Sequence, residues 1–288
     1  MIKKYVLRKL SVYTLCLILI AMFYFLPTKQ SDIENNNTIN NKKETTVYLL
    51  DKDKYLSNVI SYYDENSIED LMLKKIEILT YGSEELNEFD TVIPSNTKVN
   101  SLKVEKDNVY IDFSKEILSI DEFLEDKMIE SIVYSLTEVN GINNIYISVE
   151  KEKLLSLPSG KELPYPLTRE YGINKEYDLN SLININKTVV YFIKSINNNK
   201  YYVPVTKVNN DNESKIEIII KELKSSVNSQ NNLGSNINDT IKLINYKIED
   251  NSMILTFNKE LNDDNKSLIN KSIKENYKID EVKYKVKK

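Results

Sequence analysis

The sequence predicts an α+β protein built from two tandem copies of one unit with the element order ββαββαβ. After residue 45, the same succession of β-rich and helical patterns occurs twice, at an offset near 143 residues where the copies start and 137 where they end. Apolar residues alternate in the β-rich segments and recur with helical spacing in the segments between them. Each copy spans about 100 residues, an ordinary size for a domain.

An uncharged apolar segment before the repeat predicts a membrane anchor. Residues 10–26 read LSVYTLCLILIAMFYFL, and residues 1–9 carry four basic residues and no acidic one. Seventeen helical residues span about 26 Å, close to a hydrocarbon core of about 30 Å. Because basic flanks stay on the cytoplasmic side, we expect a cytoplasmic segment 1–9, a transmembrane helix 10–26 and a body outside the cytoplasm.

The apolar segment has two alternative interpretations, a cleaved signal peptide and a lipoprotein signal. A signal-peptide cleavage site requires small residues, whereas residues 25–28 read Phe-Leu-Pro-Thr. An acylated cysteine follows a small residue, whereas Cys16 follows Leu15 in the middle of the apolar run. An uncleaved single-pass anchor is therefore preferred. Residues 27–45 are polar and rich in Asn, which predicts a flexible linker.

The first copy, residues 46–150, opens with a hairpin and a helix. Residues 46–63 are two β-rich segments around a polar turn, a pattern that is typical of a hairpin. A helix is predicted over 67–82, because apolar residues recur there with helical spacing. Ser67 begins this helix as its N-cap, and Gly82 ends it.

The rest of the first copy predicts a second hairpin, a second helix and a last strand. Residues 97–117 form two strands around the polar turn Asp107-Asn108, and alternation on the returning strand predicts one buried face. Residues 127–150 hold an apolar helical face, then an Asn-Gly pair that ends the helix, then an alternating strand.

The second copy, residues 187–288, repeats this order. Its hairpins are predicted over 189–208 and 240–261, a helix over 215–227, and the last helix and strand over 268–286. In the last strand, lysines alternate with apolar residues, so the lysine face is expected to be exposed or to protect an edge strand.

Residues 151–186 join the two copies. They contain Pro158, Pro164 and Pro166, half of the six prolines in the chain. Because proline restricts the backbone, this composition predicts a structured connector.

Composition and charge exclude several classes of function. The 288 residues contain no His, no Trp and one Cys, which excludes Ser-His-Asp and Cys-His catalytic groups, imidazole zinc sites and an intrachain disulfide. The net charge of −4 divides into +4 for residues 1–9 and −8 for the remainder, which does not fit a nucleic-acid binder. We therefore predict no catalytic, cofactor-binding or metal-binding residues, and leave the binding residues unassigned.

Carboxylates are the remaining candidates for catalysis. A hydrolase of cell-wall glycan needs two carboxylates at a defined separation, and Glu77, Glu84, Glu85 and Asp112 are available. No spacing selects a pair among them. Asp112 lies between two strand residues predicted to be buried, so we expect its side chain to be solvated or to accept a hydrogen bond from a nearby turn.

A module that binds peptidoglycan or peptides is another alternative. The pairs Tyr62-Tyr63 and Tyr201-Tyr202 offer rings that stack on sugars, although aromatic residues in strands more often pack within the fold. The Lys-rich end, from Lys283 onward, offers an auxiliary contact to anionic lipid or wall polymer.

Several segments carry motifs of a known family. In the first copy they are VYLL in the first hairpin, TYGSEE at the helix end, TVIPSNTKVNSLKVEKDNVYIDFSKE, and IVYSLTEVNGINNIYISVE. With them the chain resembles the GerMN domain, found in tandem in GerM-type sporulation and spore germination proteins. The connector LPSGKELPYPLTREYGIN resembles the segment after the first domain of that family. Ser83 departs from the family's Pro and Asn96 from its Gly, and Thr256 replaces Asp112 in the second copy.

The resemblance implies domains similar to the ring-building motifs of secretion machines, in an envelope protein of a spore-forming bacterium. It implies association with the channel apparatus that links mother cell and forespore, and a ring-type oligomer. Many members are lipoproteins, and the missing lipobox is a departure. We expect a non-enzymatic scaffold in the cell membrane that docks with channel or wall-assembly components, with no cofactor. The alternatives are a peptidoglycan- or peptide-binding module and, less favoured, a glycan hydrolase.

Overall fold

The computed structural model describes residues 43–210, 212–225 and 232–287. The predicted cytoplasmic segment 1–9 and membrane anchor 10–26 lie outside these residues. Within the described part of the chain, no helix has the length and apolar character needed to cross a membrane.

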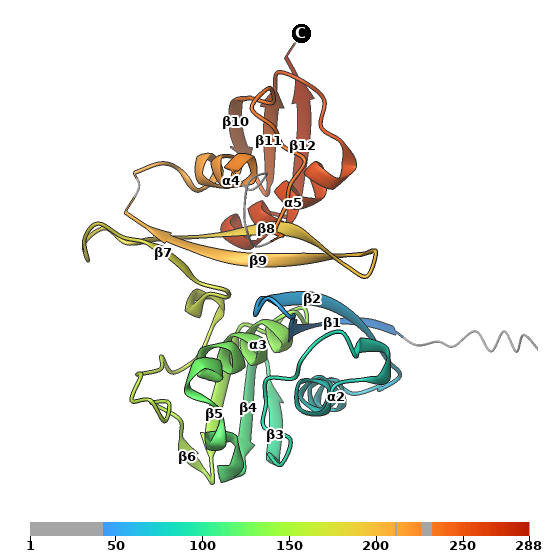
Figure 1. Cartoon of the computed structure of the whole chain (residues 1–288), viewed down its shortest axis with the longest axis vertical. Helices are drawn as coiled ribbons and strands as arrows, with labels where there is room; N and C mark the ends of the chain where they lie inside the picture. The colour runs from blue at the N-terminus through green and yellow to red at the C-terminus, as the bar shows by residue number, and fades with distance from the viewer. Residues whose placement is uncertain (1–42, 211, 226–231, 288) are drawn as a thin grey trace, which may run out of the picture. The chain divides into compact units, whose positions relative to one another are not determined.

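The first copy contains the predicted order ββαββαβ (Figure 1). Its main elements are β1 (Lys43–Leu50), β2 (Leu56–Tyr63), α2 (Ile68–Tyr81), β3 (Val99–Glu105), β4 (Asn108–Phe113), α3 (Glu125–Thr137) and β5 (Asn144–Val149). Strand β1 starts at Lys43, so the placement of residues 43–45 in the linker was wrong. They pair with β2 as part of the first hairpin.

The second copy has the same order, and the connector contributes short elements before it. The connector holds β6 (Glu152–Lys153), a 3-10 turn (Arg169–Tyr171) and β7 (Glu176–Asp178). The second copy consists of β8 (Asn186–Ile196), β9 (Asn199–Asn209), α4 (Lys215–Ser225), β10 (Leu243–Glu249), β11 (Ser252–Phe257), α5 (Asp263–Tyr277) and β12 (Glu281–Val286).

Residues at both ends of helix α2 cap it as the local sequence predicts. The Ser67 side chain accepts a hydrogen bond from the Asp70 amide, which satisfies one of the free N–H groups of the first turn. Gly82 has φ +73°, a conformation that favours glycine, and its amide donates to the Ile78 carbonyl. The predicted cap and stop are therefore confirmed.

Three sheets organise the described chain. The first copy has the sheet β3-β4-β5-β6 and the second has β10-β11-β12, while the hairpins of both copies share a sheet of order β1-β2-β9-β7 in which β8 also pairs with β9. In each copy, helices lie between the hairpin and the other sheet, because α3 contacts β1 and β5, and α5 contacts β8 and β12 (Figure 1).

Each copy has its own hydrophobic core, and the connector belongs to the first one. Leu154, Leu157, Leu163, Leu167 and Ile173 of the connector are buried in the core of the first copy. The connector is therefore structured, as its prolines predicted, and it covers part of the first copy instead of lying free between the two.

Lys75 on α2 is a buried cation, and we expect its removal to stabilise the protein. Its ammonium donates to the Thr46 carbonyl, and burial lowers the pKa of Lys75 to about 8. Since the unfolded chain binds more protons between pH 8 and about 10.4, wild-type stability should rise across that window. We expect Lys75→Met to raise the free energy of unfolding at pH 7 by about 2 kcal/mol, after allowing for the lost hydrogen bond.

Urea unfolding at pH 7 and pH 10 measures this effect. Lys74→Met is the matched control, because Lys74 is partly exposed and pairs with Glu77 on the helix surface. A Lys75→Met gain that is equally large at pH 10, or a loss at pH 7, would contradict the burial penalty.

Candidate functional site: the interface between the two copies

The hairpins of the two copies join at their tips and exchange side chains. Strand β2 pairs with β9 at Asn58 and Tyr202, which links the copies in one sheet. Tyr55 from the first hairpin packs against the core of the second copy. Ile196 and Tyr201 from the second hairpin pack against the core of the first. The copies therefore interlock, and each core is completed by the other copy.

Equivalent tyrosines meet at the centre of this interface. Tyr48 and Tyr191 lie 143 residues apart, the offset between the copies, and their hydroxyl oxygens are 3.4 Å apart. The Tyr48 amide donates to Ser135 Oγ at 2.9 Å, and the Tyr191 amide donates to Ser272 Oγ at the same distance. Ser135 and Ser272 are themselves separated by the second repeat offset, so the contacts follow an approximate two-fold relation.

Two equivalent glutamates flank the tyrosines and share one arginine. The Tyr48 hydroxyl donates to Glu138 Oε2 at 3.2 Å, and the Tyr191 hydroxyl contacts Glu275 Oε2 at 3.4 Å. Arg169 donates through one terminal nitrogen to Glu138 and through the other to Glu275, each at 2.5 Å. A single guanidinium thus compensates two carboxylates, one from each copy, which its planar fork of donors permits.

The connector holds Arg169 in place for this contact. Its Nε donates to Thr137 Oγ1 at 2.9 Å, and its guanidinium lies over the Tyr134 ring at 4.6 Å from the ring centre. Burial raises the pKa of Glu275 above its ordinary value, although the Arg169 charge opposes this shift. Arg169 is therefore the main group that permits a carboxylate at this buried position.

A second ion pair also joins equivalent positions of the two copies. Lys194 Nζ lies 2.7 Å from Asp51 Oδ2 and 2.7 Å from Asp53 Oδ2, and Lys194 and Asp51 are again 143 residues apart. Asp51 also accepts hydrogen bonds from the amides of Asp53 and Tyr55 and from the Ser57 hydroxyl. The repeat thus carries opposite charges at one position, and these charges pair.

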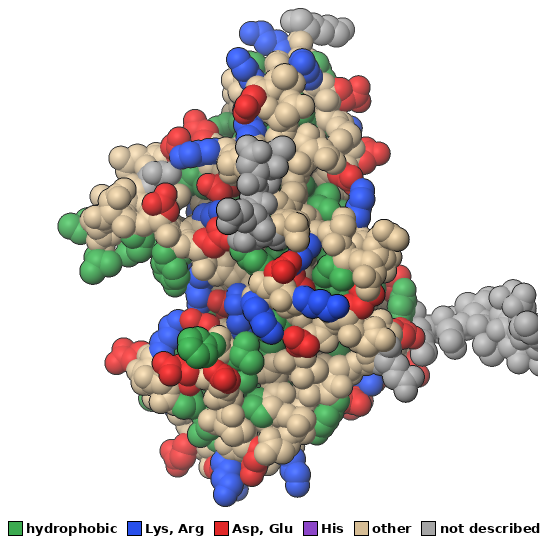
Figure 2. Space-filling view, viewed as in Figure 1, with side chains coloured by type: hydrophobic (Ala, Val, Ile, Leu, Met, Phe, Trp, Pro, Cys, Tyr) green, Lys and Arg blue, Asp and Glu red, His purple; other side chains and the backbone are tan. Residues whose placement is uncertain are grey.

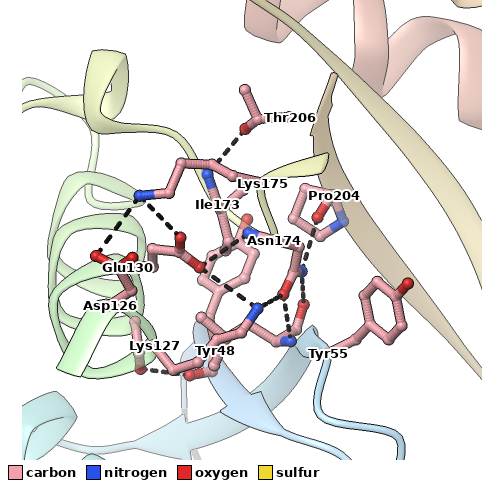
Figure 3. Close-up of polar contacts among 12 residues, drawn as sticks. Tyr48, Tyr55, Asp126, Lys127, Glu130, Ile173, Asn174, Lys175, Pro204 and Thr206 are labelled. Atoms are coloured by element: carbon pink, nitrogen blue, oxygen red, sulfur yellow. Dashed lines mark hydrogen bonds and ion pairs between the residues drawn. The ribbon is translucent and has the colours of Figure 1, made fainter. Parts of the chain in front are cut away.

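Asn174 of the connector closes the gap between β2 and β9 (Figure 3). Its Nδ2 donates to the carbonyls of Leu56 at 2.9 Å and Pro204 at 2.8 Å. Its Oδ1 accepts from the Leu56 amide at 2.9 Å and from Lys127 Nζ at 2.7 Å. One buried side chain therefore replaces ladder hydrogen bonds between strands of different copies. Asn174 has φ +48°, which Asn adopts more readily than most residues.

Charged groups on α3 support Asn174 from the other side (Figure 3). Glu130 accepts from the Asn174 amide at 2.8 Å and pairs with Lys175 at 3.1 Å. Lys127 lies 3.6 Å from the same carboxylate. Burial lowers the pKa of Lys175, although Glu130 and Asp126 oppose this shift. The network thus ties the connector to α3 while Asn174 ties it to both hairpins.

The candidate carboxylates for catalysis lie in separate places. Glu77 is on α2 and pairs with Lys74, and Glu85 is exposed in the 3-10 turn Glu84–Leu86. Asp112 lies on β4, on the face of the sheet β3-β4-β5-β6 opposite Ile111 and Phe113. Glu77, Glu85 and Asp112 therefore lie on three different elements, and no hydrogen bond joins their described side chains.

Asp112 is buried, so the expectation of a solvated side chain was wrong, and the alternative of a bond to a turn was right. It accepts from Ser148 Oγ at 2.7 Å, from Asn100 Nδ2 at 3.0 Å and from the Lys151 amide in the turn after β5 at 2.8 Å. Burial alone would raise the pKa of Asp112, but these hydrogen bonds lower it overall. The carboxylate is therefore ionised at neutral pH and acts as an acceptor that closes a turn.

The tyrosine pairs make packing contacts. Tyr201 packs edge-to-face on Phe89 with ring centres 5.0 Å apart, and Lys271 lies over the Tyr202 ring at 4.6 Å. Tyr62 is 46% exposed on β2. Three further tyrosines, which sequence reasoning did not single out, pack together beside the sheet β3-β4-β5-β6. The rings of Tyr110 and Tyr146 stack with centres 4.6 Å apart, and the Tyr165 ring packs edge-to-face on Tyr146 with centres 5.1 Å apart.

Arg169 and Asn174 are the interface residues that sequence reasoning missed. One signal was available for Arg169, because every other basic residue after Arg8 is a lysine. An arginine in such a composition indicates a position that needs a planar, two-pronged donor. No signal distinguished Asn174 in an Asn-rich chain. Within the described residues, no group of three Asp, Glu, His or Cys residues is arranged to hold a metal ion.

Comparison with known proteins agrees with this architecture. Residues 46–155 match the Germane family, described as sporulation and spore germination. The chain is 28% identical over 243 residues to the spore germination protein GerM of Bacillus subtilis (strain 168), covering 81% of this chain and 66%, just under two thirds, of that protein. Among solved structures, it resembles the tandem GerMN domains of the sporulation protein GerM from Bacillus subtilis, with a TM-score of 0.78 and 25% identity over 85% of this chain and 91% of that one.

Proposed function

The chain is a GerM-type protein with tandem GerMN domains, and on this premise we propose that it is an extracytoplasmic scaffold that acts in spore formation or germination. Residues 10–26 hold it in the cell membrane, and the two copies dock with other envelope proteins. The interlocked interface supports this proposal most strongly. Its buried polar groups form hydrogen bonds and ion pairs that join the two copies. These contacts hold the two binding units in one fixed geometry.

A fixed pair of units suits docking more than catalysis. Two linked contacts bind with an avidity that exceeds either contact alone, provided their geometry allows both to form. The connector, through Arg169 and Asn174, holds that geometry. Asp112, the leading candidate for a catalytic carboxylate, accepts a hydrogen bond from the Lys151 amide in a turn. The second copy has Thr256 at the equivalent position.

The charge of the two copies favours oriented docking. Residues 46–150 contain nine basic and 22 acidic residues, a net charge of −13, whereas residues 187–288 contain 18 basic and 13 acidic residues, a net charge of +5. Figure 2 shows Lys side chains in blue at the top of the view, around the end of β12. Such an asymmetric distribution orients the body in the field of a charged partner.

The partners we propose are components of the channel apparatus between mother cell and forespore, or of cell-wall assembly. Purification of the tagged full-length chain from sporulating cells should recover such envelope components. A variant with Asp112→Asn should recover the same set. Recovery of no envelope protein, or degradation of purified peptidoglycan by the full chain that Asp112→Asn abolishes, would overturn the scaffold proposal.

A further inference from the structure

In the first copy, the connector pairs with the outer edge of strand β5 in the sheet β3-β4-β5-β6. Ile145 on β5 exchanges both backbone hydrogen bonds with Leu167, each at 2.9 Å. The Ile147 carbonyl accepts from the Leu154 amide at 3.0 Å, and β6 continues this antiparallel pairing. Leu154 and Leu167 are buried, so the connector also supplies the apolar cover along this edge.

In the second copy, the same edge is open within the described residues. Strand β12 lies parallel to β11, as β5 lies parallel to β4, and it ends the sheet β10-β11-β12. The Lys287 amide donates to the Phe257 carbonyl, as the Glu150 amide donates to Phe113 in the first copy. By the two-residue period of a strand, the backbone groups of the even-numbered residues of β12 therefore face away from β11.

The even-numbered residues are the counterparts of the residues that bind the connector. Val282 and Tyr284 stand at the repeat offset of 137 from Ile145 and Ile147. Among the residues described, neither has a backbone partner on the outer side. Val286 at the end of the strand is 49% exposed, whereas the equivalent Val149 is only 8% exposed. In the described part of the chain, this edge thus has neither the hydrogen-bonding strand nor the apolar cover that the first copy has.

The charge of this edge restricts what can bind to it. Lys283, Lys285 and Lys287 are exposed and lie on one face of the strand. Two β12 strands paired in antiparallel fashion would set lysines against one another, which is unfavourable. A second copy of the chain is therefore a poor occupant, and an acidic strand is a good one.

We infer that the outer edge of β12 accepts an extended segment of a partner protein as an antiparallel fourth strand. The segment alternates acidic residues, which face the β12 lysines, with apolar residues, which continue the inner row of Val282, Tyr284 and Val286. The antiparallel direction follows the pairing of β6 with β5. This inference rests on the proposed docking function and names the surface and the partner chemistry for it.

Peptide binding to the full-length chain in detergent tests the inference. The probe is fluorescent acetyl-Glu-Val-Glu-Ile-Glu-Val-Glu-amide, and binding is followed by anisotropy. The peptide with Lys in place of every Glu, and an acidic peptide interrupted by Pro, are the comparison probes. We expect binding of the alternating acidic peptide alone. No binding of that peptide, or equal binding of all three, overturns the inference.

Charge reversal on the strand gives the sharper result. Lys283→Glu with Lys285→Glu should weaken binding of the acidic peptide about tenfold or more and create binding of the Lys peptide. Lys103→Glu is the matched control, since Lys103 is also exposed on a strand, in the first copy. Val286→Pro should weaken binding with unchanged thermal stability, because it removes an outward-facing N–H that is not part of the β11 ladder. Unchanged binding in both β12 variants contradicts the inference.

The purification from sporulating cells separates this inference from the proposed function. If the wild type recovers envelope proteins and the doubly charge-reversed chain loses at least one of them, both hold. If the reversed chain recovers the full set, the scaffold proposal holds and the β12 inference fails. If the wild type itself recovers none, the scaffold proposal fails.

Discussion

Replacing Arg169 by Met is expected to lower the free energy of unfolding by about 2–4 kcal/mol. The guanidinium is the shared partner of Glu138 and Glu275, and its loss removes the cation that donates hydrogen bonds to both of these carboxylates from different copies. Breaking a buried pair costs about 3–5 kcal/mol. We expect somewhat less, because the Glu138 side chain is 32% exposed, whereas that of Glu275 is only 10% exposed.

The loss at Arg169 should depend on pH. Burial already raises the pKa of Glu275, and removal of the cation raises it further. The folded variant then binds more protons than the unfolded chain, so its stability falls as pH rises through the raised pKa. Urea unfolding should show a larger gap between wild type and Arg169→Met at pH 8 than at pH 5.

Arg169→Lys is the control that keeps the positive charge and removes the planar guanidinium. A lysine keeps one positive charge but cannot donate to both carboxylates from a planar group, so we expect an intermediate loss. A variant series in which Met and Lys behave alike, or in which pH has no effect, would show that the two glutamates do not depend on this cation.

Replacing Asn174 by Ala is expected to cost about 3–5 kcal/mol. The change removes the partners of the Leu56 amide and carbonyl and of the Pro204 carbonyl, which join the strands of the two copies. Each buried group left without a partner costs about 1–3 kcal/mol. Ala at φ +48° adds a strain of about 1 kcal/mol.

Asn184→Ala separates the backbone strain from the hydrogen bonds. Asn184 has φ +56°, but its side chain is exposed in the loop before β8. It should therefore cost only the strain, about 1 kcal/mol. Chemical unfolding followed by far-UV circular dichroism measures both variants. Equal losses of unfolding free energy at the two positions would show that the hydrogen bonds of the Asn174 side chain do not stabilise the contact between the copies.

Loss of either connector residue also bears on the proposed scaffold. Since Arg169 and Asn174 each contact both copies, we expect the copies to unfold in two transitions in the variants where the wild type shows one. A body with uncoupled copies would retain each docking surface but lose the fixed geometry between them.

Much of the fold was predictable because its determinants are local. Helix α2 begins after its N-cap Ser67 and ends at Gly82, and the capping hydrogen bonds of both residues reach four residues at most. The alternation in β4 and β11 predicted which faces are buried, and Val109, Ile111 and Phe113 are indeed buried. Because each copy repeats the same local patterns, the second copy was predictable from the first.

Asp112 shows where local reasoning stops. Alternation correctly placed its side chain on the face opposite Ile111 and Phe113, but alternation carries no information about what covers that face. The donors that bury it, Ser148 and the Lys151 amide, lie 36 and 39 residues further along the chain. Its environment was therefore decided by the pairing of β4 with β5.

The sequence by itself determined that this protein has two copies of one α+β unit, the order of their elements and a structured connector, because periodicity and capping act between near neighbours. Only the tertiary structure decided that the hairpins share a sheet and that Arg169 pairs with a glutamate of each copy. It also decided that one sheet edge is covered while its counterpart has no backbone partner among the described residues. The contacts of Arg169 and of the shared sheet join residues from 31 to 144 positions apart, and the covered edge pairs Ile145 with Leu167, 22 positions further along. Which of many possible partners meet across such separations depends on packing the whole chain at once, and no short pattern records the result.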